Sequence, residues 1–323
     1  MVVDKDLSEN IVNEAIKKGY ENCGIISINK MEKYNEYLDE RINKIPESAM
    51  VYGFSDFFKN IKEVYPWAKS IVILTSWLGK YRYPESLNGR YSKSFMLSVD
   101  PIKECEEYKQ KTNFEKWMDT ENIQFAGRER EDSVGLVPLR HSAVMAGLGI
   151  YRKNNFFYGE KGSYYKLEGY LIDKECEYIH ETNLIPCSPS CNICKNACKT
   201  GALVDDYTMN PLMCTSFITT FGGGNLTDDI TEDMLEEWIC GCDACQDACP
   251  HNRHDWSTGK EFYGLEELVP LLEPENLINA SDEELIEKII PKTDFHIPPE
   301  QVELLRKNAK RAVEFRKNQK YKP

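Results

Sequence analysis

The stretch that decides the fold is CSPSCNICKNACKTGA, residues 187–202, together with a second run, CGCDACQDACPHN, at residues 240–252. In the first run, two residues separate Cys191 from Cys194 and three residues separate Cys194 from Cys198. The second run repeats this spacing, and a proline follows its last cysteine. The bacterial ferredoxin pattern ends in the same way. The repeated spacing therefore predicts a ferredoxin-like domain that holds two [4Fe-4S] clusters.

The ferredoxin pattern also predicts which cysteines share a cluster. In ferredoxins with two clusters, the last cysteine of a run binds the other cluster. A separate cysteine between the runs can supply a missing ligand. We therefore expect one cluster on Cys187, Cys191, Cys194 and Cys249, and the other on Cys198, Cys214, Cys242 and Cys245.

The two runs depart from the pattern at three places. Cys187 precedes Cys191 by one residue too many, Lys199 replaces the first proline, and Cys240 stands two positions before Cys242. Cys240 is therefore either a spare thiol or a substitute ligand. Structural zinc held by four thiolates is the alternative to iron, but zinc sites do not explain the three-residue spacing or the final Cys-Pro.

The remaining cysteines and the nearby histidines have weaker signals. Cys23, Cys105 and Cys176 have no partner at ligand spacing and are expected to be small buried hydrophobic residues. His251 and His254 follow the second run, where they could either donate a hydrogen bond to a cluster sulfur or face solvent. No histidine is expected to be a metal ligand.

Composition limits the class of protein. The 323 residues include 53 acidic and 40 basic side chains, a net charge of −13, which disfavours a protein that coats nucleic acid through its overall field. The first twenty residues lack the apolar core of a secretory signal. The apolar run at residues 70–79 is too short to span a bilayer. We expect a cytoplasmic protein without a membrane segment. Because the cytoplasm keeps thiols reduced, bound metal explains the cysteines better than disulfides do.

Hydrophobic periodicity predicts an α/β (α+β) arrangement over the first half of the chain. In the first expected helix, Ile11, Ala15 and Ile16 are placed on one side. The expected helices are residues 8–19, 102–123 and 138–147, and the expected strands are residues 23–28, 70–74 and 163–172.

Three domains are expected from these patterns. Residues 1–175 form the α/β catalytic domain, residues 176–255 the two-cluster domain, and residues 256–323 a helical C-terminal segment that packs back on the core. In the last segment, Ser281 is the predicted cap of a helix with an acidic first turn.

The segment PLRHSAVMAGLGIYRKNNFFYGEKGSYYKLEGYLID, residues 138–173, followed by the cysteine runs, resembles the epoxyqueuosine reductases and, more distantly, the reductive dehalogenases. YPWAKSIVIL at residues 65–74, GRYSKS at 89–94 and LLRKNA at 304–309 also resemble parts of that family. The resemblance thus runs nearly from end to end. It implies a cobalamin-binding N-terminal domain placed ahead of two [4Fe-4S] clusters.

The resemblance implies a set of cobalamin-binding residues. We expect Gly147 and Gly149 to let a flat corrin ring approach the backbone, although a simple helix end is the alternative for such a turn. His141 could approach the cofactor or be an ordinary core residue. The full expected set is Arg140, His141, Ala146, Gly147, Leu148, Gly149, Lys153, Asn154, Gly162, Ser163 and Tyr164.

The catalytic acid is less clearly marked. The family places an aspartate as proton donor about a dozen residues before the Ala-Gly-Leu-Gly turn. Here Ser133 falls on that position and Asp132 lies next to it. Asp132 is the expected proton donor, with Glu131 second and Tyr158 as a phenolic alternative. A solvated charged turn is the other interpretation of this segment.

The resemblance implies an oxidoreductase in which the clusters reduce cobalamin to Co(I), which then reduces an electrophilic substrate, as in queuosine synthesis on tRNA. A low-potential donor such as ferredoxin or flavodoxin would supply the electrons. Two alternatives stay open: a related enzyme that reduces a small electrophilic or halogenated molecule, and an electron-transfer protein without cobalamin. The acidic net charge gives little support to tRNA, although residues 302–323 carry eight basic and two acidic side chains.

Overall fold

The computed structural model of the protein describes residues 3–52, 61–97, 103–127, 137–292 and 297–320. The chain divides into two compact units. Unit 1 contains residues 1–77 and 106–189, and unit 2 contains residues 78–105 and 190–323. Among the described residues, no helix combines the length and the apolar character needed to cross a membrane.

These units differ from the expected division at residues 175 and 255. Residues 176–189 stay with unit 1, because Tyr178 exchanges two backbone hydrogen bonds with Ile25 of the first strand. Residues 78–105 join unit 2, because Tyr91 forms a β-bridge with Cys240. The cysteine runs from residue 190 onward and the C-terminal helices therefore belong to one unit, whereas Cys187 lies in the other.

Unit 1 is built on an antiparallel sheet with the strand order β1-β2-β6-β3. The strands are β1 (Asn22–Ser27), β2 (Ser70–Trp77), β3 (Phe125–Ala126) and β6 (Tyr165–Ile172). Ile73 of β2 lies opposite Gly24 on one side and Gly169 on the other. The apolar, β-branched run of β2 is buried on both faces, as its central place in the sheet requires.

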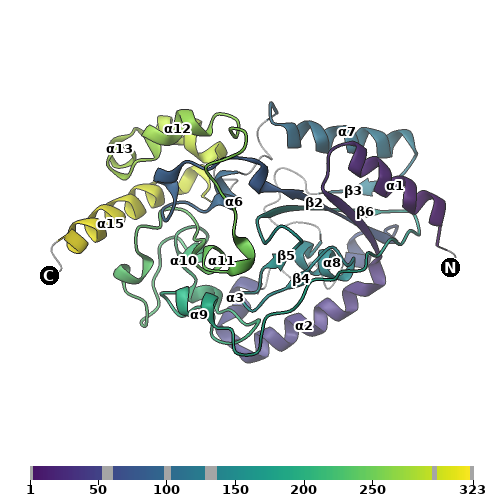
Figure 1. Ribbon diagram of the computed structural model, residues 1–323, viewed down its shortest axis with the longest axis horizontal. Helices are drawn as coiled ribbons and strands as arrows, with labels where there is room; N and C mark the ends of the chain where they lie inside the picture. Colours follow the sequence, from purple (N-terminus) through teal and green to yellow (C-terminus); the bar gives the residue numbers. More distant parts are fainter. Residues whose placement is uncertain (1–2, 53–60, 98–102, 128–136, 293–296, 321–323) are drawn as a thin grey trace. The chain divides into compact units, whose positions relative to one another are not determined.

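Helices cover both faces of this sheet (Figure 1). Side chains of α1 (Lys5–Lys17) and α7 (Glu106–Thr120) pack on one face in a cluster that includes Ile11 and Phe114. On the other face, α2 (Met31–Lys44) and α8 (Leu139–Met145) contribute Met31 and Ala143 to a second cluster. The shorter helices α3 (Ala49–Tyr52) and α5 (Ile61–Val64) also belong to unit 1.

Helix α1 begins where the Asp4 carboxylate accepts a hydrogen bond from the backbone N–H of Leu7, a typical N-cap. Ile11 and Ala15 face the core as expected. The placement of Ile16 beside them is wrong: its side chain is 44% exposed, and Val12 takes the buried position.

A small hairpin follows α8 and precedes β6. It pairs β4 (Ile150–Tyr151) with β5 (Phe157–Tyr158), and residues 152–156 form the turn between them. Asn155 in this turn has a positive φ of 67°. The hairpin lies next to α8 in unit 1, and its turn holds much of the candidate site described below.

Unit 2 consists of short helices joined by irregular segments. The backbone N–H of Glu284 bonds to the Ser281 side chain, which confirms Ser281 as a helix cap. The helices are α6 (Lys93–Met96), α9 (Ile193–Ala197), α10 (Thr215–Ile218), α11 (Ala244–Asp247), α12 (Leu265–Leu272), α13 (Pro274–Asn279), α14 (Asp282–Glu284) and α15 (Val302–Lys320).

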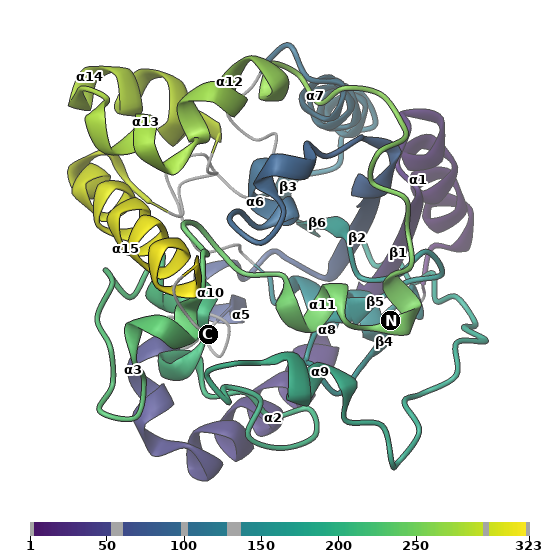
Figure 2. The ribbon, with the colours of Figure 1, turned by 60° about the vertical axis from the view of Figure 1, so that its left-hand side comes forward.

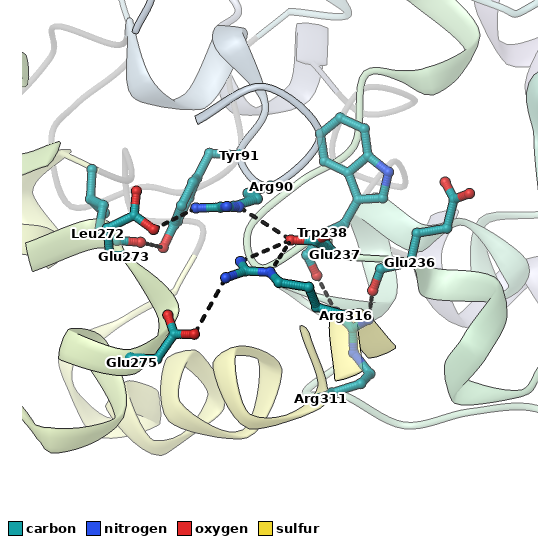
Figure 3. A network of polar contacts seen from close by, with 10 residues as sticks. All are labelled: Arg90, Tyr91, Glu236, Glu237, Trp238, Leu272, Glu273, Glu275, Arg311 and Arg316. Carbon is teal, nitrogen blue, oxygen red and sulfur yellow. Dashed lines mark hydrogen bonds and ion pairs between the residues drawn. The ribbon is translucent and has the colours of Figure 1, made fainter. Parts of the chain in front are cut away.

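Helix α15 lies beside α13 in both ribbon views (Figures 1 and 2). Figure 3 shows how polar side chains anchor it within unit 2. Arg311 donates hydrogen bonds to the carbonyl groups of Glu236 and Trp238, and Arg316 binds Glu237 at 2.9 Å. Several basic residues of the C-terminal segment are thus bound inside the protein.

Candidate cluster-binding and cofactor site

The two cysteine runs adopt the same local structure. Cys194 lies within α9 and Cys198 caps its C-terminal end. In the second run Cys245 lies within α11, and Cys249 precedes a short 3-10 helix that begins at Pro250. Helices α9 and α11 pack against each other. All twelve cysteines are free thiols. The repeated spacing therefore corresponds to a repeated helical turn.

Thiols from three segments of unit 2 raise one another's pKa. Burial raises the pKa of Cys242 well above its ordinary value, and the nearby sulfurs of Cys214 and Cys245 raise it further. The pKa of Cys245 is raised in the same way, by burial and then by Cys214 and Cys198. Close, buried thiols without a cation resist ionisation. Bound iron would supply the positive charge that converts them to thiolates.

Backbone N–H groups also point at these sulfurs. The amides of Phe217 and Ser216 bond to the sulfur of Cys214, and the amide of Ala244 bonds to that of Cys242. Each of these bonds favours the thiolate. Hydrogen bonds to sulfur are a common feature of iron-sulfur sites, where they stabilise the negative charge of the cluster. This donor set fits a [4Fe-4S] cluster.

Cys187 belongs to unit 1 and has different neighbours. Nη1 of Arg152 lies 3.8 Å from its sulfur. Two residues further on, the carbonyl of Pro189 accepts a hydrogen bond of 2.7 Å from Nζ of Lys153. Both cationic residues are buried, with 3% exposure each. The loop that carries Cys187 is therefore held by the β4–β5 turn.

The four cysteines outside the expected ligand set are buried. Cys23, Cys105 and Cys176 are each at most 4% exposed, as expected for small core residues. Cys240 has no exposed surface, and burial alone raises its pKa to about 12. The sulfurs that raise the pKa of Cys242 do not contribute to the raised pKa of Cys240. Cys240 is therefore not assigned to a cluster.

The two histidines after the second run have different surroundings. His251 is exposed, and the ring of His254 packs edge-on against Trp256 with 4.9 Å between ring centroids.

Helix α8 carries the first part of the expected cofactor set. Burial lowers the pKa of His141, although a hydrogen bond to the backbone of Lys30 opposes this shift. Its Nε2 atom and the Oγ atom of Ser142 are buried without a hydrogen-bond partner. Arg140 is exposed, and its Nη1 donates to the carbonyl of Asn155 at 2.6 Å.

The two glycines after α8 serve packing within the protein. Gly147 has a φ of +73°, and a Cβ atom there would lie 1.8 Å from the carbonyl oxygen of His180. A Cβ atom at Gly149 would lie 2.2 Å from the carbonyl oxygen of Tyr158. The space that a side chain would fill is therefore occupied by backbone. These contacts give a packing reason for glycine at both positions, and the positive φ of Gly147 agrees with the helix-end alternative. The approach of a corrin ring to this turn stays a prediction.

The rest of the expected set is buried around the hairpin. Nδ2 of Asn154 donates to the hydroxyl of Tyr158 at 2.9 Å, and Tyr158 has no exposed surface. Gly162 forms a β-bridge with Gly159. The other members of the expected set with less than 10% exposure are Ala146, Leu148, Ser163 and Tyr164.

Sequence reasoning missed the polar residues next to this set. Arg152 and Asn155 are 3% and 2% exposed. Arg41 of α2 donates to Oδ1 of Asn155, and Nδ2 of Asn155 has no partner. A run of four polar residues between two strands is typical of an exposed turn. The signal in the sequence was the length of this turn. Two residues are enough to close a hairpin, so a longer turn can have another role.

Asp132 and Glu131 lie outside the described residues, since the structure describes the chain up to residue 127 and again from residue 137. The remaining candidate acid, Tyr158, is fully buried and accepts a hydrogen bond from Asn154.

Comparisons with known proteins agree with this geometry. Residues 187–252 match the family model of a 4Fe-4S double cluster binding domain. An epoxyqueuosine reductase of Cyclobacterium marinum is 29% identical over 250 residues, which cover 74% of this chain and 77% of that protein.

Two solved epoxyqueuosine reductases share the fold. One was crystallised with an epoxyqueuosine-modified tRNA-Tyr stem loop; it has a TM-score of 0.69 at 21% identity and covers 96% of this chain and 81% of its own. The other, from Bacillus subtilis, is described with its catalytic aspartate loop swung out of the active site. Its TM-score is 0.70 at 22% identity, with coverage of 96% and 82%.

The fold and the cysteine domain define an oxidoreductase with a 4Fe-4S double cluster binding domain. The resemblance to the epoxyqueuosine reductases, predicted from residues 138–173 and the cysteine runs, is confirmed over most of the chain.

Proposed function

We propose that this protein is a cobalamin-dependent reductase that acts on epoxyqueuosine in tRNA and receives electrons through two [4Fe-4S] clusters. One observation carries the proposal: the fold of an epoxyqueuosine reductase solved with its modified tRNA stem loop covers 96% of this chain. A low-potential donor such as ferredoxin or flavodoxin supplies the electrons.

Each cluster is assigned four cysteines, as the ferredoxin crossover requires. Cys198, Cys214, Cys242 and Cys245 hold one cluster. The sulfurs of Cys214 and Cys198 raise the pKa of Cys245 more than the sulfur of Cys194, a ligand of the other cluster, does. The backbone N–H groups at Cys214 and Cys242 also support this set. The remaining ligands, Cys187, Cys191, Cys194 and Cys249, hold the other.

Cobalamin is proposed to bind unit 1 beside α8 and the β4–β5 turn. Buried polar atoms without partners are rare, and four occur here: His141 Nε2, Ser142 Oγ, Arg152 Nε and Asn155 Nδ2. The amide-rich periphery of cobalamin offers partners for such atoms, so these residues fit the cofactor. When bound, cobalamin supplies the metal centre through which electrons reach the substrate.

Asp132 is the proposed proton donor, with Glu131 second and Tyr158 third. A carboxyl group buried beside an apolar ring has a raised pKa and stays protonated at neutral pH, so it can protonate the substrate as electrons arrive. The catalytic aspartate loop described for the Bacillus subtilis enzyme supports an aspartate in this role.

A tRNA substrate needs a local basic surface, because the net charge of the chain is −13. Lys307, Lys310 and Lys317 are exposed on α15. They supply positive charge that Arg311, which is buried, and Arg316, which is paired with Glu237 and Glu275, do not offer.

Anaerobic purification followed by gel filtration with added cobalamin tests the cofactors. The brown protein should contain about eight iron and eight sulfide per chain, and corrinoid should elute with it. Stoichiometric zinc without sulfide would exclude the clusters. Full clusters without retained corrinoid would favour an electron-transfer protein.

A matched pair of variants locates the cobalamin site. Ser142 and Ser48 both have no exposed surface, but Oγ of Ser48 is bonded to the carbonyl of Ile45 and Oγ of Ser142 has no partner. Ser142→Val should weaken corrinoid retention at unchanged iron content. Ser48→Val should retain corrinoid as the unchanged protein does; equal retention by both variants would place the cofactor elsewhere.

A further inference from the structure

Arg152 is a buried cation beside a candidate cluster ligand. It is the first residue of the β4–β5 turn, and 3% of it is exposed. Its Nη1 atom lies 3.8 Å from Sγ of Cys187, within the range of an N–H···S hydrogen bond. Neither the cysteine spacing nor the expected cofactor set pointed to this residue.

The surroundings of Arg152 do not neutralise its charge. Its guanidinium lies 5.2 Å from the ring centroid of Tyr158, a cation–π contact, and Nε has no hydrogen-bond partner. Within the part of the chain that the structure describes, it forms no ion pair with a carboxylate. A buried charge without a counter-ion is costly. The site therefore calls for an anion near the sulfur of Cys187.

The adjacent residue holds the same loop in place. Nζ of Lys153, which is also 3% exposed, donates to the carbonyl of Pro189 at 2.7 Å. Two successive residues of one turn thus contact the loop that contains Cys187. Arg152 reaches the sulfur and Lys153 reaches the backbone two residues later. This arrangement fixes the distance between the guanidinium and the ligand sulfur.

We propose that Arg152 sets the reduction potential of the cluster bound by Cys187, and that it acts through the sulfur of Cys187. This inference rests on the proposed function, because it requires that Cys187 bind iron. A [4Fe-4S] cluster with four thiolates is an anion and becomes more negative when it accepts one electron; no bond forms or breaks in this step. A nearby cation and a hydrogen bond to sulfur stabilise the reduced form more than the oxidised form. Arg152 therefore raises the reduction potential of this cluster.

The other cysteine group provides an internal reference. The hydrogen bonds to Cys214 and Cys242 come from backbone amides, which no side-chain substitution at Arg152 removes. The negative charge of the cluster on Cys187 is thus stabilised by the Arg152 side chain, and that of the other cluster by backbone amides. A change confined to Arg152 should move one potential and leave the other in place.

The test is a redox titration of the anaerobic protein, followed by electron paramagnetic resonance so that the two clusters are resolved. Arg152→Met should shift one cluster to a more negative potential at unchanged iron content. Arg152→Lys keeps the charge and should shift that cluster less. The second cluster should keep its potential in both variants.

Arg41→Met is the matched control. Arg41 contacts the same turn through Asn155 but no cysteine, so its loss should leave both potentials unchanged. If the Arg152→Met protein loses iron, the potential measured for the Arg152→Lys protein tests the proposal instead. A variant with full iron and unmoved potentials, or with both potentials shifted equally, overturns the role of Arg152. Either result leaves the proposed reductase standing, whereas protein without iron or sulfide would refute the clusters themselves.

Discussion

At the scale of single residues, the position of each candidate ligand within a short helix explains how sulfurs from distant segments meet. Cys198 ends α9, yet its sulfur affects the pKa of Cys245 in α11. This proximity is what a ferredoxin-type exchange of the last cysteine would produce. By the same rule we assign Cys249 to the cluster of Cys191 and Cys194.

Serine substitutions test this exchange. Cys249→Ser should remove the cluster of Cys191 and Cys194, leaving about four iron per chain, whereas Cys242→Ser should remove the other cluster. The residual paramagnetic spectra of the two variants should differ and add up to that of the unchanged protein. Identical residual spectra would mean that Cys249 and Cys242 share a cluster. As a control, Cys240→Ala should keep both clusters, because Cys240 is fully buried and is not among the eight assigned ligands.

The candidate ligands could be predicted from the sequence because iron-sulfur ligation fixes the spacing of cysteines along the chain. The polar residues of the β4–β5 turn could not. Arg152 and Asn155 are buried by contacts with Cys187 and Arg41, which are remote in sequence. From the sequence alone, the polar character of these residues predicts that their side chains are exposed.

At the scale of elements, most long segments were predicted, but helix α2 was missed although its apolar residues recur at helical spacing as regularly as those of α1. β2 follows from its apolar run and β6 from the strand character of its sequence, and α8 begins after Pro138 as expected. In α2, the buried side chains are Met31 and Leu38. Antiparallel pairing of β2 with β6 joins segments nearly one hundred residues apart, a distance over which hydrophobic periodicity carries no information.

A pair of glycine variants tests the end of α8. Gly147 and Gly89 have φ values of +73° and +75°, but only Gly147 has a backbone atom where a Cβ would lie. Gly89→Ala should cost about 1–2 kcal/mol for the left-handed backbone. Gly147→Ala should cost about 1–3 kcal/mol more, because the chain must also move away from His180. Thermal unfolding measures the difference, and equal losses for the two variants would contradict the packing role of Gly147.

At the scale of the whole molecule, the division into units depends on pairings that the sequence does not display. Residues 78–105 belong with the cysteine unit because Tyr81 and Tyr91 form bridges with Lys260 and Cys240. The C-terminal helix belongs there through Arg311, whose buried guanidinium binds two carbonyl groups. Such contacts are set by the fold and cannot be assigned from periodicity.

The most direct test of the proposed function is turnover of tRNA that carries epoxyqueuosine. The protein, with both clusters and cobalamin bound, is mixed with this tRNA and a low-potential electron donor, and the digested nucleosides are analysed by mass spectrometry. We expect queuosine to replace epoxyqueuosine. Omission of cobalamin should abolish the conversion, as should Asp132→Asn at unchanged iron and corrinoid content. Unaltered epoxyqueuosine in the presence of fully loaded and reduced protein would contradict the proposed function.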